Sequence, residues 1–199
     1  MFPDKFQYYK IYKPYGMLSQ FTGGDERSTL KDLYNFPKDV YPVGRLDADS
    51  EGLLLLTDDK ALTDALLNPS NRHQREYRVQ VEGIPDERDL ETLRKGLVIK
   101  GRRTFPAEAE IISLPHLPPR VPPIRERKHI PDSWLRITLK EGKNRQVRRM
   151  TAAIGFPTLR LVRVRIENIL LENMKPGEVK PLSLKEINEL QIRMRAVKK

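Results

Sequence analysis

The residues of this chain best placed to do chemistry lie in the run VGRLDADSEGLLLLTDD, residues 43–59. One carboxylate of this run, Asp47, stands between the basic Arg45 and the apolar stretch LLLL. Gly44 and Gly52 lie on either side, and glycines so placed indicate a tight, specific backbone path. An acid held beside a buried sheet is placed to do chemistry. A solvated turn also uses acids, so the run alone leaves both interpretations open.

The same acids resemble a calcium-binding loop. Asp47, Asp49, Glu51, Gly52 and Asp58 fall at characteristic positions of an EF-hand. The flanks disagree, because an EF-hand needs a helix on each side, whereas the entering segment VYPVGRL carries a proline and a glycine and LLLL resembles a buried strand. The last loop position also favours Glu over Asp. Calcium binding is therefore the weaker alternative.

A second candidate group lies in EGKNRQVRRMTAAIGF, residues 141–156, where the pattern predicts a helix. At helical spacing one face is apolar, with Val147, Met150 and Ile154. Arg145 and Arg149 point away from that face, towards solvent or phosphate. Arg148 lies at the rim between the faces, where a guanidinium can reach inward and must then pair with an anion.

These residues must be positioned by a mixture of strands and helices. Apolar and alternating runs predict strands at 7–13, 17–21, 53–57, 75–82, 97–100, 107–112, 134–139 and 159–167. Helices are predicted from a cap at Asp58 to a stop before Pro69, from about Asp86 to Gly96, between the last two strands, and from Leu184 onward. This order predicts an α+β protein. With no repeat and no clear linker, it also predicts one domain over residues 1–199, with room for two subdomains.

Positive charge is concentrated towards the C-terminal end. The net charge is +10; residues 143–199 hold 14 Lys and Arg against 5 Asp and Glu, a net of +9, which leaves +1 for the rest. Such asymmetry favours a polyanionic partner, either nucleic acid or an anionic membrane surface. Between Ser113 and Asp132, six prolines are interspersed with basic residues, which predicts a stiff, extended, basic loop.

Composition excludes several other classes. A chain of 199 residues with 38% hydrophobic content can build a core. It shows no signal-peptide pattern and no apolar stretch of membrane-spanning length, so we expect a cytoplasmic protein without a membrane partner. The absence of cysteine excludes disulfides and thiolate metal sites, and the three histidines lack ligand spacing (His73, His116 and His129). The sequence therefore predicts neither a metal nor an organic cofactor.

Four segments resemble, in order and spacing, successive motifs of the RNA pseudouridine synthases, in the branch that modifies bacterial ribosomal RNA. They are KPYG at 13–16, GRLDADSEGLLLLTDD at 44–59, REYRVQVEG at 75–83 and EGKNRQVRRMTAAIGFPTLRLVRVRI at 141–166. Members often carry a small RNA-binding domain before the KPxG strand, and this chain begins about twelve residues before it, so no such domain is expected. With the loop PPRVPPIRERK, the chain looks most like the short synthases that act on large-subunit (23S) rRNA.

The resemblance implies a central mixed, mainly antiparallel sheet with flanking helices, and the isomerisation of a specific uridine to pseudouridine without a cofactor. By resemblance Asp47 is the catalytic carboxylate, which either attacks the sugar or supports its elimination. Arg148 matches the second Arg of an RQxR pattern and is the expected partner that offsets the burial of Asp47. Tyr77 matches the site tyrosine, which can stack on the flipped uracil and help remove its C5 proton. Arg75 stands where a Lys is usual, which preserves the charge.

Further residues receive supporting roles. Leu161 is expected to form the apolar floor of the pocket, although Leu159 competes for that role. Lys13 and Pro14 are expected to be structural. Arg45 would meet phosphate or orient the flipped nucleotide. The remaining expected phosphate contacts are Arg120, Arg125, Arg127, Lys128, Arg145, Arg149, Arg160, Arg163 and Arg165.

The expected partner is 23S rRNA, either naked or within an assembling large subunit, and the chain is expected to act as a monomer. The principal alternative is a basic RNA-binding or ribosome-associated module without catalysis. The two differ in the need for a cleft. Only an enzyme needs an ionised Asp, an Arg and an aromatic ring together in one.

Overall fold

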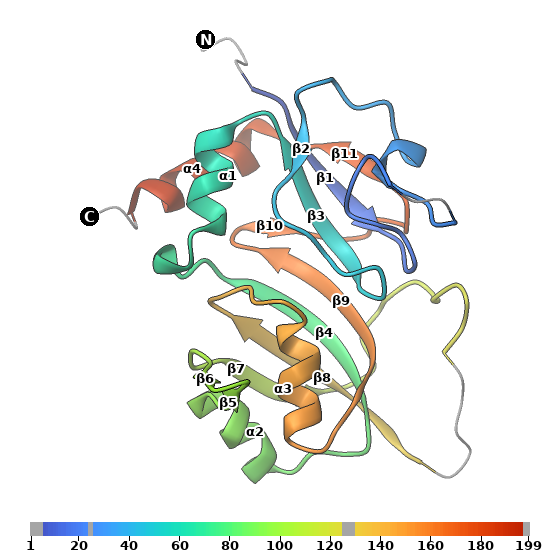
Figure 1. Cartoon of the computed structure of the whole chain (residues 1–199), viewed down its shortest axis with the longest axis vertical. Coiled ribbons are helices and arrows are strands. Elements are labelled where there is room, and N and C mark those ends of the chain that lie inside the picture. The colour runs from blue at the N-terminus through green and yellow to red at the C-terminus, as the bar shows by residue number, and fades with distance from the viewer. Residues whose placement is uncertain (1–5, 24–25, 125–129, 197–199) are drawn as a thin grey trace.

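The computed structural model describes residues 6–23, 26–124 and 130–196. Its centre is one mixed sheet in the order β11-β1-β3-β9-β4-β8-β7, with β2 added to β3 and β10 to β9 (Figure 1). The strands are β1 (Tyr8–Lys13), β2 (Tyr41–Pro42), β3 (Glu51–Thr57), β4 (Arg75–Glu82), β7 (Glu108–Ile112), β8 (Asp132–Leu139), β9 (Thr158–Ile166), β10 (Ile169–Leu170) and β11 (Val179–Pro181). The short strands β5 (Val98–Ile99) and β6 (Arg102–Arg103) form a separate hairpin.

The helices are α1 (Lys60–Leu67), α2 (Glu87–Lys95), α3 (Gln146–Ala153) and α4 (Leu184–Ala196), together with two 3₁₀ turns, Leu30–Asp32 and Pro69–Asn71. Every neighbouring pair in the sheet is antiparallel except β3 and β9, which run parallel. The α+β class and the mixed, mainly antiparallel sheet are therefore confirmed. Within the described parts of the chain, no helix is long and apolar enough to cross a membrane.

The core is divided between the two halves of the sheet. Helices α1 and α4 pack beside β1, β3 and β9 through residues that include Leu62, Leu66 and Leu190. Helices α2 and α3 pack on β4, β7 and β8, where Leu93 and Met150 are fully buried. Figure 1 shows these two helix pairs at opposite ends of the molecule, with β3 and β9 between them. The site lies near this junction.

The junction requires a glycine. Gly52, in β3, has a φ of +102°, and a Cβ there would lie 2.3 Å from the carbonyl oxygen of Arg163 in β9. Any other residue would therefore push β9 away from β3. Asp47 lies five residues before Gly52 in the chain, so this close approach also fixes the distance between the Asp47 loop and β9.

Most predicted elements are present, and two details were wrong. Residues 17–21 form a loop, not a strand; Leu18 and Gln20 exchange backbone hydrogen bonds with residues 28 and 30 of the following loop. Helix α1 is capped by Asp59, whose Oδ1 accepts from the N–H of Leu62, while Asp58 accepts from the N–H of Gln7. Two adjacent aspartates both suit a helix start, and the exit direction of β3 selects the second.

Candidate active site

A cleft of about 530 Å³ opens between the loop that precedes β3, the strands β4 and β9, and the segment that leads into α3. Its lining includes Asp47, Tyr77 and Leu161, which lie far apart in the sequence. Cations from several elements line it as well, among them Arg45, Arg145 and Arg163. The structure thus brings together an acid, an aromatic ring and positive charge.

The loop that carries Asp47 is held from below by several hydrogen bonds. The Oγ of Ser19 both accepts from the N–H and donates to the carbonyl oxygen of Leu46. The carbonyl oxygen of Ala48 accepts from the N–H of Gly16 at 2.7 Å and from the Nζ of Lys13 at 3.5 Å. The loop therefore has the narrow backbone path that its glycines predicted.

Lys13 is the buried centre of this support. Its ammonium also donates to the carbonyl oxygens of Pro14 and Met17, at 2.9 and 2.8 Å. Burial disfavours the charged form, which lowers the pKa of Lys13 to about 8 although nearby acids oppose the shift. Three carbonyl acceptors give Lys13 the structural role that the sequence predicted.

Asp47 itself remains open to the cleft. Its side chain is 33% exposed, and its nearest cation is Arg145, with 3.8 Å between Nη1 and Oδ2. The expected pairing with Arg148 is wrong at the level of direct contact. Arg148 instead places its Nε 3.4 Å from Oδ2 of Asp49 and donates through Nη2 to the Asp49 carbonyl oxygen. Arg148 therefore contacts the residue two positions after Asp47 and reaches Asp47 only through its charge.

Asp49, rather than Asp47, makes the close contacts with Arg145 and Arg148. Arg145 binds it with two hydrogen bonds of 2.9 and 2.7 Å. Burial opposes ionisation of Asp49, but the hydrogen bonds from Arg145 and the charges of Arg148 and Arg145 outweigh it and hold the pKa of Asp49 below its usual value. Asp49 is thus an ionised anchor between the loop and α3.

The start of α3 is built to present Arg145. Its backbone is left-handed, with a φ of 50°, at the residue that precedes the helix. The side chain of Gln146, the first residue of α3, folds back onto the segment before Arg145. Its Oε1 accepts from the N–H of Lys143, and its Nε2 donates to the side chain of Glu141 at 2.6 Å. The apolar face predicted for the helix is present, because Val147 and Met150 are buried.

Tyr77 is positioned by an irregularity in the sheet. The register of β4 against β9 shifts between Glu76 and Tyr77, which sets Tyr77 opposite Arg163. Bulges of this kind re-aim side chains and are frequent beside active sites. Tyr77 is 7% exposed and packs in the same cluster as Val79, so it is both a core residue and part of the cleft wall.

The floor of the cleft contains Leu161, whereas Leu159 is not part of the lining. Arg163, on the same face of β9 as Leu161, is buried in the cleft. Its Nε donates to the carbonyl oxygen of Leu53 at 2.8 Å, while its Nη2 is buried without a hydrogen-bond partner in the described structure. We expected a surface phosphate contact here; the period-two alternation from Leu161 already indicated the cleft.

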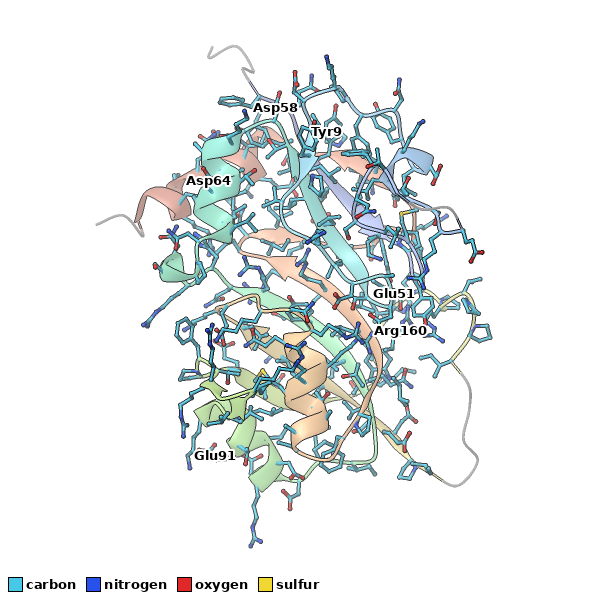
Figure 2. All side chains as sticks on the ribbon, in the orientation of Figure 1. Tyr9, Glu51, Asp58, Asp64, Glu91 and Arg160 are labelled. Atoms are coloured by element: carbon cyan, nitrogen blue, oxygen red, sulfur yellow. The ribbon has the colours of Figure 1, made fainter. Side chains whose placement is uncertain are left out.

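Two other predicted phosphate contacts are occupied within the protein. Arg160 is buried and forms two hydrogen bonds of 2.8 Å with Glu51, which lies next to it in Figure 2, where β3 meets β9. Its Nη2 also donates to the carbonyl oxygen of Pro118. Arg165 pairs with Glu76 at 3.0 Å. Phosphate contact was therefore the wrong prediction for Arg160 and Arg165, since these guanidiniums have internal partners.

The remaining basic residues differ in whether their side chains have partners within the protein. Arg45 is exposed at the cleft and makes no ion pair or hydrogen bond that the described residues reveal. Arg149 donates to the side chain of Asn144. Arg120 lies 4.2 Å over the ring of Tyr15 and donates to two proline carbonyls of its own loop. Arg125, Arg127 and Lys128 lie outside the described residues.

The calcium alternative fails on the structure. The later positions of the proposed EF-hand loop form β3, and its acids have separate partners: Arg145 for Asp49, Arg160 for Glu51 and the N–H of Gln7 for Asp58. Among the described residues, no group of three or more His, Cys, Asp or Glu side chains could hold a metal ion.

The cations that line the cleft suit a polyanion, and a carboxylate together with an aromatic ring in one cleft is an arrangement that an enzyme acting on nucleic acid can use. The comparison with protein families agrees. Residues 7–153 match the model of the RNA pseudouridylate synthase family, and the chain belongs to that family. It is therefore an isomerase that acts on uridine in RNA.

Individual relatives are similar over most of their length. The chain is 54% identical to the ribosomal large subunit pseudouridine synthase E of Vibrio parahaemolyticus over 86% of this chain and 72% of that protein. It is 50% identical to the protein of the same name from Xanthomonas axonopodis pv. citri, over 82% of this chain and 87% of that protein. A crystal structure described as a pseudouridylate synthase superposes with a TM-score of 0.77 at 28% identity, covering 94% of this chain and 74% of that one.

Proposed function

We propose that this protein converts a specific uridine of 23S rRNA to pseudouridine, with Asp47 as the catalytic carboxylate. The observation that supports this assignment is the meeting of Asp47, Tyr77 and Leu161 in one cleft. The relatives named as large-subunit synthases support the choice of RNA. A binding module without catalysis would not need an open carboxylate in the same cleft as a buried tyrosine.

The reaction breaks the N1–C1′ bond of the uridine, turns the uracil and forms a C5–C1′ bond. N1 gains a proton and C5 loses one, so no oxidant, reductant or second substrate is consumed. Asp47 acts at the sugar, because it lines the cleft and its carboxylate oxygens remain accessible there, with one cation at 3.8 Å. Its ionised form is the reactive one.

Tyr77 and Arg163 act on the base. The ring of Tyr77 stacks on the flipped uracil, and its hydroxyl assists removal of the C5 proton. The unpaired Nη2 of Arg163 donates to an oxygen of the nucleotide, which supplies the partner that this buried guanidinium lacks. Arg148 is a positioning residue, since it holds the loop through Asp49.

The decisive variant is Asp47→Asn, which keeps the shape of the side chain and removes the ionised oxygen. We expect pseudouridine formation to be abolished while RNA affinity and the melting temperature change little, because Asp47 is partly exposed and its one ion pair is long. Asp64→Asn, on the exposed side of α1 and labelled in Figure 2, is the matched control and should retain full activity.

The readout is pseudouridine mapping of 23S rRNA from cells that lack the protein, complemented with each variant. Loss at one position, restored by wild type and Asp64→Asn but not by Asp47→Asn, would identify both substrate and catalyst. Substantial conversion by purified Asp47→Asn would refute the role of Asp47.

Several finer points stay predictions. The continuous sheet supports one domain over residues 1–199. A ribosomal RNA substrate supports a cytoplasmic location. Light scattering would test the predicted monomer, and assays on naked rRNA and on isolated precursor particles would test the state of the substrate. Activity that persists in chelator, on an RNA whose fold does not need magnesium, would support a reaction without metal or cofactor.

A further inference from the structure

A second hollow of about 800 Å³ lies beside the catalytic cleft, over β2 and the loops that precede it. Its wall includes the rings of Phe21, Phe36 and Tyr41. It adjoins the cleft, because the linings of the two share Ser19, Gln20, Gly44, Arg45 and Leu67. We call this hollow, defined by its rings and the shared residues, the aromatic groove.

Tyr41 is the exposed ring of the groove, with 62% of its surface accessible. Its backbone is fixed, since β2 pairs with β3 through Tyr41 and Thr57. Its ring meets that of Phe21 nearly at right angles, with 6.2 Å between centroids, and Phe21 meets Phe36 at 5.7 Å. Tyr41 is thus a rigidly mounted aromatic ring that the protein leaves open to solvent.

The charge around this ring is positive. Lys31, Lys38 and Arg45 line the groove, and no carboxylate side chain is part of its described lining. In the described structure none of the three forms an ion pair. Aromatic rings beside free cations are the arrangement that binds unpaired nucleotides, because each base can stack and each phosphate needs a cation.

The groove is also close to the reaction. Tyr41 and Asp47 are joined by one short segment, and the chain from 41 to 47 can span no more than about 20 Å even when fully extended. Arg45 stands between them and borders both hollows. A nucleotide next to a uridine in the cleft can therefore reach the groove.

We propose that the aromatic groove is a second nucleobase site, in which an unpaired base near the target uridine stacks on Tyr41 while its phosphates contact Lys31, Lys38 or Arg45. This inference rests on the proposed action on RNA. It gives the protein a means of selecting its substrate from the bases around the uridine, since an RNA that cannot place an unpaired base there loses the contact.

The first test compares Tyr41→Ala, Tyr41→Phe and Tyr34→Ala in pseudouridine formation on a short RNA that spans the modified position. Tyr41→Ala should raise KM by about 5- to 150-fold, the range expected for one base stacked on one ring, with kcat nearly unchanged. Tyr41→Phe should retain the wild-type KM. Tyr34, 48% exposed and in edge contact with Phe36 but outside the groove lining, is the matched control.

The second test locates the base. Single abasic nucleotides are placed in turn around the target uridine, and KM is measured with wild type and with Tyr41→Leu, which keeps an apolar side chain but no ring. At one position, base removal should weaken wild type strongly and Tyr41→Leu hardly at all.

The outcomes separate the two proposals. No pseudouridine formation by wild type would refute the proposed function. Conversion by wild type with KM unchanged in Tyr41→Ala, or equal abasic effects in wild type and Tyr41→Leu, would refute the nucleobase site. The latter results are those expected if the groove binds a protein partner.

Discussion

At the scale of single residues, two acids share the cations of α3 unequally. Asp49 receives both hydrogen bonds of Arg145 and the closer approach of Arg148, whereas Asp47 receives one contact of 3.8 Å. A carboxylate already bound by guanidinium has little free lone-pair surface for a substrate. The division of partners therefore leaves the Asp47 carboxylate open to a substrate, while Asp49 anchors the loop to α3.

This division can be tested by double-mutant cycles for the free energy of unfolding. Arg148→Ala and Asp49→Ala should be coupled by about 1 kcal/mol, because the two side chains meet at 3.4 Å and the acid is partly exposed. Arg148→Ala and Asp47→Ala should show a smaller coupling. A larger coupling with Asp47 would restore the direct pair that the motif suggested.

The sequence could predict that an arginine of α3 and an acid of the loop belong together, but not which acid. Asp47 and Asp49 are separated by one residue and have the same chemistry. Only the path of the loop, fixed by Lys13, Ser19 and Gly52, decides which carboxylate faces the helix. The alternation with Leu161 places Arg163 on the cleft face, but no local pattern reveals the bulge in β4 that sets Tyr77 opposite it.

Lys13 gives a prediction about pH. The pKa of Lys13 is about 8 in the folded protein against an ordinary value of 10.5. Between these values the unfolded chain binds a proton that the folded protein does not, so the free energy of unfolding should rise with pH. Relative to Lys13→Met, wild type should gain about 2 kcal/mol from pH 8 to pH 10.

Urea unfolding of both proteins across this range gives the difference. The comparison stops at pH 10, because burial raises the pKa of Tyr12 to about 12, and the unfolded chain starts to lose its tyrosine protons there. Above pH 10 this loss of tyrosine protons from the unfolded chain lowers the free energy of unfolding, which is opposite to the effect of Lys13. A difference between wild type and Lys13→Met that does not vary with pH would contradict a depressed pKa for Lys13.

At the scale of elements, the junction of β3 and β9 determines the site. It joins the two halves of the sheet through a short parallel pairing, the close contact of Gly52 with Arg163, and the buried pair of Glu51 with Arg160. The carbonyl oxygen of Pro118 completes the partners of Arg160, which ties the loop after β7 to the same point.

Breaking that pair should be costly. Glu51→Gln leaves a buried guanidinium without its counter-charge, and we expect a loss of about 3–5 kcal/mol in urea unfolding. The control is Glu110→Gln, which removes an exposed partner of Arg136 on β8 and should cost less than about 1 kcal/mol. The double variant Glu51→Leu with Arg160→Met should recover much of the loss. Equal effects of Glu51→Gln and Glu110→Gln would mean that the junction pair is solvated.

Elements with strong periodicity were predictable, such as β4 with its alternation of Tyr77, Val79 and Val81. The short strands β2, β10 and β11 were not, because two or three residues carry no period. Their existence depends on pairing with β3, β9 and β1. Arg160 shows the same limit, since a strand arginine resembles a surface cation until its partner 109 residues earlier is known.

At the scale of the whole molecule, the net charge of +10 overstates the surface available to RNA. Arg160, Arg165 and Lys10 are held by acids inside the protein. The described cations that remain free beside the cleft and the aromatic groove include Arg45, Lys140, Lys31 and Lys38. RNA affinity should therefore depend on a few positions rather than on total charge.

The salt dependence of RNA affinity gives the number of cations that contact phosphate. Each phosphate neutralised by a protein cation adds about −0.7 to the slope of log affinity against log salt for single-stranded regions. Arg45→Gln and Lys140→Gln should each flatten the slope by about that amount, because both side chains line the cleft and have no acidic partner among the described residues. Lys95→Gln makes the same charge change at a residue that pairs with Glu91 on α2 and is not part of the cleft lining, and it should leave the slope unaltered. Arg165→Gln should also leave it unaltered, because the guanidinium of Arg165 is bound to Glu76.

Titration of a fluorescent RNA at several salt concentrations measures all four slopes. If Arg165→Gln flattens the slope as much as Arg45→Gln does, RNA must displace the internal ion pairs, and its path would cross the outer part of β9.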